Sequence, residues 1–163
     1  MTKSVSNSEF YILHDFENTS IGKKLSAWPL HCTITPFFIT DSISETDIIG
    51  VSKAVVEAFD PIEINSGKKA LYGPNENIPV LEVKDNQNQL HKLHSSLIFY
   101  LGFSSCRILD YSYALDNYSP HVTLKTNQSL PDFPYLIKTL SLGKKTSRAS
   151  LNKSIIATFN IGT

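Results

Sequence analysis

The chain has 163 residues, of which 41% are hydrophobic and 18% are charged. These proportions are typical of a globular protein and exclude a disordered chain. Fifteen basic residues balance fifteen acidic ones, so the overall charge offers no sequence-independent attraction for nucleic acid. The length is sufficient for one well-buried domain, and we expect residues 1–163 to form a single domain.

The cysteine content and the N-terminal residues indicate the cellular compartment. Two cysteines, Cys32 and Cys106, do not make a disulfide framework. Residues 1–9 are polar and lack the apolar segment of a secretory signal. We therefore expect a cytoplasmic protein with no membrane association. A monomer with no obligatory protein partner is the default expectation, and the sequence leaves the oligomeric state open.

Alternating apolar residues and turn signals predict four strands and one helix in the first half of the chain. They span residues 10–16 (strand), 31–39 (strand), 45–59 (helix), 62–71 (strand) and 78–84 (strand). The helix begins after Ser44, because a serine followed three residues later by Asp47 forms a capping pair. The last two strands flank a Gly73-Pro74-Asn75 turn and are expected to form a hairpin. Pro36 is expected to end or bulge the second strand.

The second half predicts a similar alternation of strands and helices. The expected elements span residues 86–102 (helix), 108–115 (strand), 118–126 (strand), 131–142 (helix) and 150–161 (strand). The first of these helices has a leucine stripe from Leu90 to Leu101 and ends at Gly102. The order of elements repeats that of the first half, which predicts an internal pseudo-symmetry.

One short pattern, His-x-Thr followed by an aliphatic residue, occurs twice in the chain. In a strand, side chains two positions apart share a face, so His31 lies beside Thr33 and His121 beside Thr123. The residue between each pair faces the opposite, apolar side, so Cys32 is expected to be a buried apolar residue. If the two strands are neighbours, two imidazoles and two hydroxyls meet at one site. This set supplies an acid, a base and two hydrogen-bonding groups for phosphoester chemistry.

The two motifs resemble those of the 2H phosphoesterase superfamily, which includes 2',5'-RNA-ligase-like proteins and cyclic nucleotide phosphodiesterases. The second copy, Ser119-Pro120-His121-Val122-Thr123-Leu124-Lys125, is the better match. The resemblance covers the chain from about Phe10 onward. It implies an α+β fold: a bilobal, pseudo-twofold arrangement of two antiparallel sheets with outer helices and an active-site cleft between the lobes. It also implies an enzyme that opens a nucleoside 2',3'-cyclic phosphate to a 2'-phosphate, so the expected ligand is a nucleotide or an RNA terminus. Some members also cleave or join 2',5'-linked RNA.

The residues themselves are consistent with that chemistry. An imidazole titrates near neutral pH, so a neutral histidine takes a proton from the attacking water while a charged one protonates the departing ribose oxygen. The sequence leaves open whether His31 or His121 is the base. Thr33 and Thr123 are expected to donate hydrogen bonds to the non-bridging oxygens of the phosphate. No metal or other cofactor is required.

Further candidates for substrate contact lie near the motifs. Strand alternation returns Lys125 to the face of His121, where its charge meets the phosphate; the alternative is a solvated strand end. Three aromatic side chains are candidates for stacking on a base, and the alternative for each is packing within the protein. These are Phe37, Tyr72 and Tyr118.

Other interpretations of the sequence remain open. His91 and His94 share a helix face, as a metal pair would, but no Cys or carboxylate cluster completes such a site, so a packed or surface pair is expected. The same fold is also compatible with a module that binds a nucleotide or RNA terminus without turnover. A third alternative is a structural α+β protein in which the two motifs are a coincidence.

Overall fold

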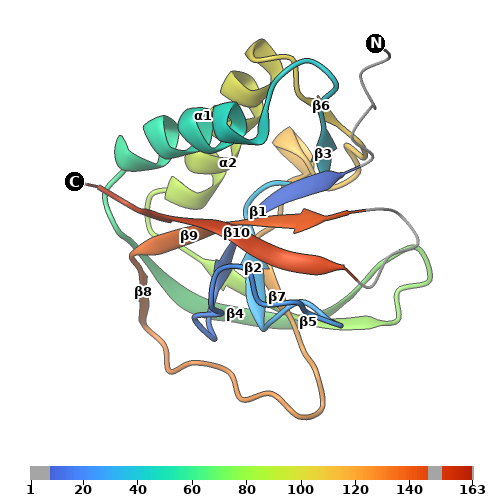
Figure 1. The fold of residues 1–163 in the computed structure, drawn as a ribbon. Coiled ribbons are helices and arrows are strands. Elements are labelled where there is room, and N and C mark those ends of the chain that lie inside the picture. The colour runs from blue at the N-terminus through green and yellow to red at the C-terminus, as the bar shows by residue number, and fades with distance from the viewer. Residues whose placement is uncertain (1–7, 147–151, 163) are drawn as a thin grey trace.

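The computed structural model describes residues 8–146 and 152–162, which form a ten-stranded antiparallel sheet with two α-helices (Figure 1). The helices are α1 (Glu45–Glu57), α2 (Gln89–Phe103) and a short 3₁₀ helix, η1 (Leu115–Asn117). The strands are β1 (Glu9–Asp15), β2 (His31–Thr33), β3 (Phe38–Ile39), β4 (Ile62–Tyr72), β5 (Ile78–Lys84), β6 (Arg107–Ile108), β7 (His121–Thr123), β8 (Tyr135–Ile137), β9 (Thr139–Lys145) and β10 (Lys153–Asn160).

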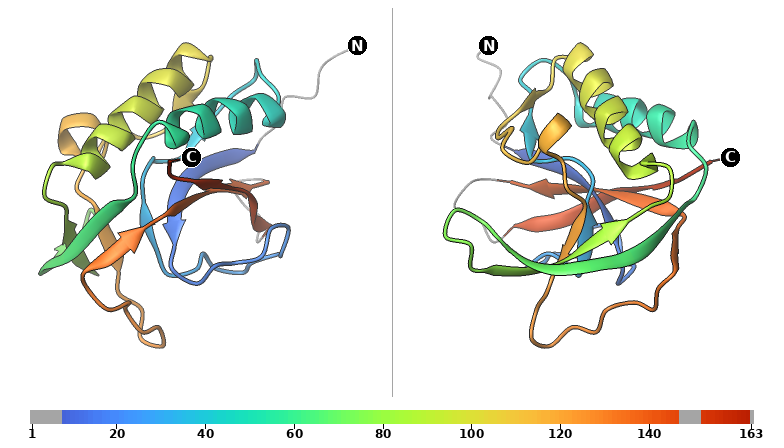
Figure 2. Two further views of the ribbon diagram at one scale, coloured as in Figure 1. Left: turned by 90° about the vertical axis from the view of Figure 1, so that its left-hand side faces the viewer. Right: turned by 180° about the vertical axis from the view of Figure 1, so that it is seen from behind.

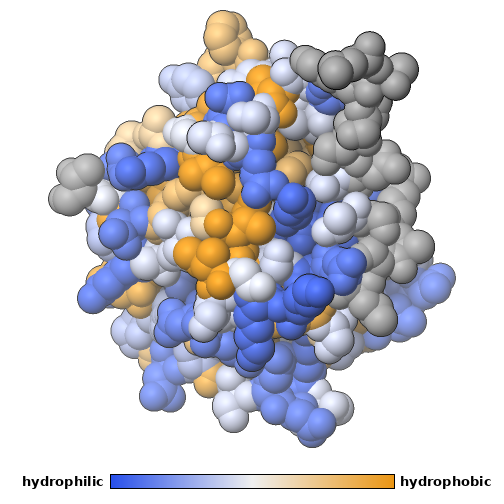
Figure 3. Space-filling view, in the orientation of Figure 1, coloured by the Kyte–Doolittle hydropathy of each residue, from blue (hydrophilic) through white to orange (hydrophobic). Residues whose placement is uncertain are grey.

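Both α-helices lie on the same side of the sheet, as two further views show (Figure 2). The main hydrophobic core fills the space between them and the sheet. The leucine stripe of α2 is fully buried there, as expected from its spacing. On the opposite face of the sheet, a smaller apolar cluster gathers around Tyr11 and Leu13 of β1. The molecule's surface in the first view is apolar beside α1 and mostly hydrophilic in its lower half (Figure 3).

The strand order is β10-β9-β1-β2-β7-β5-β4-β8, with β3 paired to β1 and β6. Four strands lie on each side of the contact between β2 and β7, which we call the β2–β7 junction. The group containing β2 combines strands from both ends of the chain, whereas the group containing β7 comes from its middle. The two groups of strands therefore do not correspond to the two halves of the sequence, whose repeated order of elements had predicted such a correspondence.

Several elements confirm the sequence predictions. The Ser44 hydroxyl accepts a hydrogen bond from Asp47 N at 3.1 Å, and the Asp47 carboxylate accepts one from Ser44 N at 3.0 Å, which completes a capping box for α1. β4 and β5 form the expected hairpin. Helix α2 begins three residues later than predicted, because the Asp85 carboxylate accepts from Gln89 N and Leu90 N at its first turn.

The predicted strand 31–39 is divided into β2 and β3. Ile34 N and Thr35 N both donate to the Ile12 carbonyl. Two consecutive residues after β2 therefore lie opposite a single residue of β1, as in a β-bulge. The Thr35 hydroxyl in turn accepts from Ile12 N at 2.9 Å. This irregularity precedes Pro36, in agreement with the expected break.

Two predictions for the second half are wrong. The region 131–142, expected to be helical, forms β8 and the start of β9, because pairing with β4 and β1 satisfies its backbone. The region 108–115 is a strand only at Ile108; the Asp110 carboxylate then accepts from Ser112 N, and the chain turns. The strand expected at 118–126 is confined to β7, and the one expected at 150–161 begins at Lys153 in the described part, with Ser150 outside the described residues.

Among the described residues, no helix has the length and hydropathy that a membrane span needs.

Candidate active site

The two His-x-Thr motifs lie on neighbouring strands at the β2–β7 junction. Cys32 is paired with Val122 in antiparallel register. His31 is therefore opposite Thr123, and His121 is opposite Thr33, all on one face of the sheet. Cys32 and Val122 are fully buried on the other face, as the alternation predicted. The structure thus brings together the four residues that the sequence singled out.

Both histidines are held in the same way. His31 Nδ1 donates to the Pro29 carbonyl at 2.6 Å, and His121 Nδ1 donates to the Ser119 carbonyl at 2.7 Å. A carbonyl oxygen only accepts, so each Nδ1 carries a hydrogen, and Nε2 is the atom that gains or loses a proton. Within the described part of the chain, no protein atom bonds to either Nε2 or to the hydroxyls of the two threonines. These four groups are available to a ligand.

The surroundings of His31 favour its neutral form. Burial lowers the pKa of His31 below its usual value, and the positive charges of Lys125 and His121 act in the same direction. The Pro29 carbonyl and the Asp15 carboxylate oppose this shift without overcoming it. Cys32 is no competing nucleophile, because burial raises the pKa of its thiol to about 12.

Each histidine has a tyrosine against its ring. The Tyr11 ring meets His31 edge-on at 5.8 Å between centroids, and the Tyr72 ring meets His121 at 4.8 Å. The Tyr72 hydroxyl donates to Glu82 Oε1 at 2.7 Å and lies 2.7 Å from the Ser119 hydroxyl. The Ser119 carbonyl accepts the hydrogen bond from His121 Nδ1, so the contacts of Tyr72 and Glu82 with Ser119 help to fix the orientation of the imidazole.

A carboxylate also occupies matching positions beside the two motifs. Asp15 of β1 is the register partner of His31, and Glu82 of β5 is the register partner of His121. The Asp15 carboxylate accepts from Glu17 N and Thr19 N, both at 2.7 Å, and thereby fixes the start of the loop between β1 and β2. The two carboxylates therefore have matching positions but different partners: Asp15 accepts from backbone N–H groups of the loop, whereas Glu82 accepts from the Tyr72 hydroxyl.

The aromatic packing beside His31 depends on Gly143. Tyr11 and Gly143 are opposite each other in the pairing of β1 with β9. A Cβ atom at position 143 would lie 2.7 Å from Tyr11 Cε1 and 3.1 Å from Trp28 Cη2. Tyr11 also packs against Trp28 and Phe37, with ring centroids 4.6 and 4.7 Å apart. Phe37 is therefore half-buried on the face of the sheet that carries the site.

Two predicted substrate contacts take other partners in the structure. Lys125 lies beyond the end of β7, so strand alternation does not place it; its Nζ donates to the Trp28 carbonyl at 2.8 Å. Tyr118 packs on the core side, stacked on His94 at 4.0 Å, and its hydroxyl donates to the Thr33 carbonyl at 2.9 Å. These contacts give Tyr118 a role in positioning the β2 backbone.

His94 is committed to the backbone. Its Nδ1 donates to the Ile34 carbonyl at 2.6 Å, and its Nε2 accepts from Leu115 N at 2.8 Å. Both ring nitrogens are therefore occupied, and neither is available as a metal ligand alongside His91. Within residues 8–146 and 152–162, no group of three or more His, Cys, Asp or Glu side chains has a metal-binding arrangement.

Sequence reasoning missed several residues of this site, above all Tyr11, Glu82, Ser119 and Gly143. The alternation of apolar residues in β1 and β5 shows which face of its strand Tyr11 or Glu82 occupies, but it does not show which strand lies beside it. A glycine within a strand marks a close approach of another group, but Gly143 gives this signal only once its segment is known to be β9, and the preceding residues were predicted to be helical.

Comparisons with known proteins identify a family and a fold. A sequence model of the 2'-5' RNA ligase superfamily matches residues 8–156. No curated protein matches the sequence. Among solved structures, E. coli LigT complexed with 3'-AMP is similar with a TM-score of 0.61 and 14% identity, over 96% of this chain and 99% of that one. A crystal structure described as a phosphoesterase has a TM-score of 0.60 and 13% identity over 96% and 99% of the two chains.

LigT complexed with NADP+ gives a TM-score of 0.58 and 13% identity, over 97% of this chain and 99% of that one. At such identities the structural likeness shows a common fold, and the family match extends over nearly the whole chain. The resemblance expected from the two motifs is confirmed. The chain belongs to the 2'-5' RNA ligase superfamily, and its fold is that of the 2H phosphoesterases.

Proposed function

We propose that this protein is a phosphodiesterase that hydrolyses the 2',3'-cyclic phosphate of a nucleotide or RNA end without a metal. His31, Thr33, His121 and Thr123 are the proposed catalytic residues. The observation that carries the proposal is their common face at the β2–β7 junction, with both Nδ1 atoms bonded to backbone carbonyls and both Nε2 atoms open. Membership of the family supports phosphoester chemistry in general.

In the proposed reaction, neutral His31 is the general base and protonated His121 is the general acid. His31 Nε2 takes a proton from water as the water oxygen forms a bond to phosphorus. The bond from phosphorus to the ribose 3'-oxygen breaks, and His121 Nε2 gives its proton to that oxygen. The product is a 2'-phosphate. Each proton transfer contributes roughly 10² to 10⁴ in rate.

The direction of the pKa shift supports this division of roles. Burial and the nearby positive charges keep His31 neutral to lower pH than an exposed histidine, as a base requires. In the proposed reaction the hydroxyls of Thr33 and Thr123 donate to the two non-bridging oxygens, where charge accumulates in the transition state. Contacts of Lys125 with the phosphate and of Phe37 or Tyr72 with the base remain part of the proposal.

Hydrolysis of 2',3'-cyclic nucleotides by purified protein, with and without a chelator, tests the proposal. We expect turnover that a chelator leaves unchanged and a 2'-phosphate product identified by chromatography. His31→Ala and His121→Ala should each lower kcat by about 10² or more, with circular dichroism showing that both variants fold. His91→Ala removes an imidazole from helix α2, outside the site, and should retain wild-type turnover.

Wild-type turnover by either active-site variant would disprove the assignment. Tight binding of the cyclic nucleotide without any product would instead favour a binding module of the same fold. We also propose that residues 1–163 form one bilobal domain and that the protein is cytoplasmic. The two cysteines, both free and buried, are compatible with that compartment.

A further inference from the structure

The β2–β7 junction, on which the candidate active site lies, contains little backbone pairing. Within the described residues, Cys32 and Val122 are the one pair of register partners between the two strands. A single pair supplies few ladder hydrogen bonds, so contacts at the two ends of the junction add to what holds the motifs together. The two ends differ in how these contacts are made.

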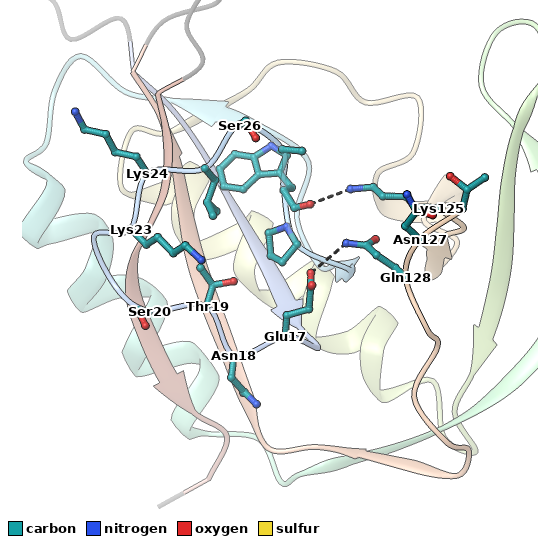
Figure 4. A pocket seen from close by; sticks show the side chains of 15 residues that line it. Glu17, Asn18, Thr19, Ser20, Lys23, Lys24, Ser26, Lys125, Asn127 and Gln128 are labelled. Atoms are coloured by element: carbon teal, nitrogen blue, oxygen red, sulfur yellow. Dashed lines mark hydrogen bonds between the residues drawn. The ribbon is translucent and has the colours of Figure 1, made fainter.

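At one end, the contact is at the surface. Because β2 and β7 are antiparallel, the residues before β2 lie beside the residues after β7. There Lys125 Nζ donates to the Trp28 carbonyl at 2.8 Å, at the border of a pocket of about 700 Å³ (Figure 4). Lys125 is exposed, and a long, solvated side chain restrains the backbone only weakly. The firmer contacts lie at the other end.

At the other end, a buried imidazole lies between the two motifs. His94 of α2 is 0% exposed. Its Nδ1 donates to the Ile34 carbonyl at 2.6 Å, and its Nε2 accepts from Leu115 N at 2.8 Å. Ile34 directly follows β2, and Leu115 begins η1, which precedes β7 in the chain. His94 therefore joins the backbone of the first motif to the segment that precedes the second.

Tyr118 adds a second connection on the same side of the sheet. Its ring stacks on His94, with centroids 4.0 Å apart and an angle of 3° between the planes. Its hydroxyl donates to the Thr33 carbonyl at 2.9 Å. The next residue is Ser119, whose carbonyl accepts from His121 Nδ1 at 2.7 Å. The backbone of Thr33 and the imidazole of His121 are thus linked through one tyrosine and its neighbour.

The residue that His94 holds has an unusual backbone conformation. Leu115 has a φ of +55°, in the left-handed region, which costs free energy in any residue with a Cβ atom. Two residues earlier, Tyr113 stacks on Tyr72, with centroids 6.1 Å apart and an angle of 8° between the rings. Tyr72 in turn contacts the ring of His121. The hydrogen bond to His94 therefore helps to set where this segment lies beside the site.

Helix α2 carries His94 within a buried face that is otherwise apolar. The fully buried leucines of this helix are Leu90, Leu93, Leu97 and Leu101. A buried polar group costs free energy unless its hydrogen bonds are made, whereas an apolar side chain fills the same space without that condition. What the imidazole adds over another leucine is therefore the position of the two backbone segments that it bonds.

From these contacts we infer that His94 is a positioning residue for the active site. Together with Tyr118, it fixes the end of β2 and the segment before β7 relative to each other, and thereby places the Thr33 hydroxyl and the His121 imidazole. It does so from the core side of the sheet, on which α2 lies. The inference rests on the proposed function and adds to it a residue outside the four that act on the phosphate.

Kinetics of three variants test this role. His94→Phe keeps an aromatic ring against Tyr118 but neither hydrogen bond. Its kcat for a 2',3'-cyclic nucleotide should fall on the order of tenfold or more, with a smaller change in KM, because small displacements of catalytic groups have large effects on rate. His94→Gln, whose amide retains a donor and an acceptor, should recover part of this loss. Val56→Ala is the control: Val56 is fully buried in α1, so the variant should lower the urea midpoint and leave kcat unchanged.

Two measurements follow the positioning without any turnover. The Leu115 amide should exchange with solvent on the order of tenfold faster in His94→Phe than in the wild type, because it loses its acceptor. Binding of inorganic phosphate, followed by the imidazole ¹⁵N signals of His31 and His121, should weaken in the same variant. Both results are expected even if no cyclic nucleotide is hydrolysed, which would refute only the proposed function.

The inference has clear grounds for rejection. It is refuted by wild-type kcat in His94→Phe, by equal exchange of the Leu115 amide in the two proteins, or by an equal loss of kcat in Val56→Ala. If circular dichroism shows that His94→Phe does not fold, Tyr118→Phe and His94→Gln decide the question. Tyr118→Phe removes only the bond to the Thr33 carbonyl and should lower kcat to a smaller extent; wild-type kcat in both variants would refute the role of His94.

Discussion

Replacing Gly143 by alanine should destabilise the protein and disturb His31 through a chain of aromatic contacts. The added methyl carbon would lie 2.7 Å from Tyr11 Cε1 and 3.0 Å from Tyr11 Cδ1, closer than carbon atoms pack. Tyr11 is only 3% exposed, and Trp28 and Phe37 block two of its sides. The ring is therefore displaced toward the rest of its surroundings, which include the His31 imidazole.

The size of the effect follows from overpacking. Adding a methyl group to a filled space costs about 1–3 kcal/mol of unfolding free energy. Gly50→Ala is the matched control, because nothing lies within 4 Å of its added carbon and the residue is within helix α1. That variant should gain about 0.5–1 kcal/mol, since alanine favours a helix over glycine. Urea unfolding of both variants measures the difference, and turnover of the cyclic substrate measures the effect on His31.

A double variant tests the cause. Tyr11→Leu removes the ring that Gly143→Ala meets, so the two substitutions together should cost at least about 1 kcal/mol less than the sum of the single effects. Tyr11→Phe keeps the ring and should give no such relief. The reasoning is refuted if Gly143→Ala unfolds at the same urea concentration as the wild type, or if its cost adds fully to that of Tyr11→Leu.

Three further predictions concern charge and capping. Lys125→Met removes a positive charge that disfavours protonated His31, so the pKa of His31 should rise. The acid limb of the plot of kcat/KM against pH should then move to higher pH. An acid limb at the wild-type pH would contradict the proposed role of His31 as the base. Burial lowers the pKa of His14 and of His94, so the unfolded chain binds protons that the folded one does not. Stability should be full above about pH 6.5 and fall as the pH drops below it, which equal urea midpoints at pH 7.5 and 5.5 would disprove. Ser44→Ala should cost about 1 kcal/mol in urea unfolding by removing the cap of α1, and an unchanged midpoint would show that the capping box contributes nothing.

The sequence predicted the parts of the fold that depend on local pattern. The leucine stripe of α2 and the capping box of α1 are contained within short segments, so their structure follows from spacing and cap residues. The His-x-Thr strands were predicted for the same reason, since alternation alone assigns His31 and Thr33 to one face.

The predictions that were wrong concern segments whose structure depends on contacts with residues far away in the sequence. Residues 131–142 contain an apolar spacing compatible with a helix, but pairing with β4 and β1 extends them. Leu115 was assigned to a strand, yet its backbone N donates to the buried His94 imidazole and its φ is +55°. Lys125 was assigned by alternation, which ends with β7 at Thr123. None of these partners is recognisable within the segment concerned.

The composition of the two strand groups bears on the order in which the site is completed during synthesis. The strands around His121, which are β4, β5, β7 and β8, all come from residues 62–137 and can pair as they emerge. The strands around His31 come from the two ends of the chain, and the hydrogen bond between His14 and the Thr139 carbonyl joins residues 125 positions apart. β1, although translated first, therefore acquires its partner β9 only after residue 145 has been made, and β9 acquires β10 only after residue 160. A nascent chain therefore contains both His31 and His121 long before the strands around His31 are complete. The pairing of these distant segments is expected to be the slow step of folding.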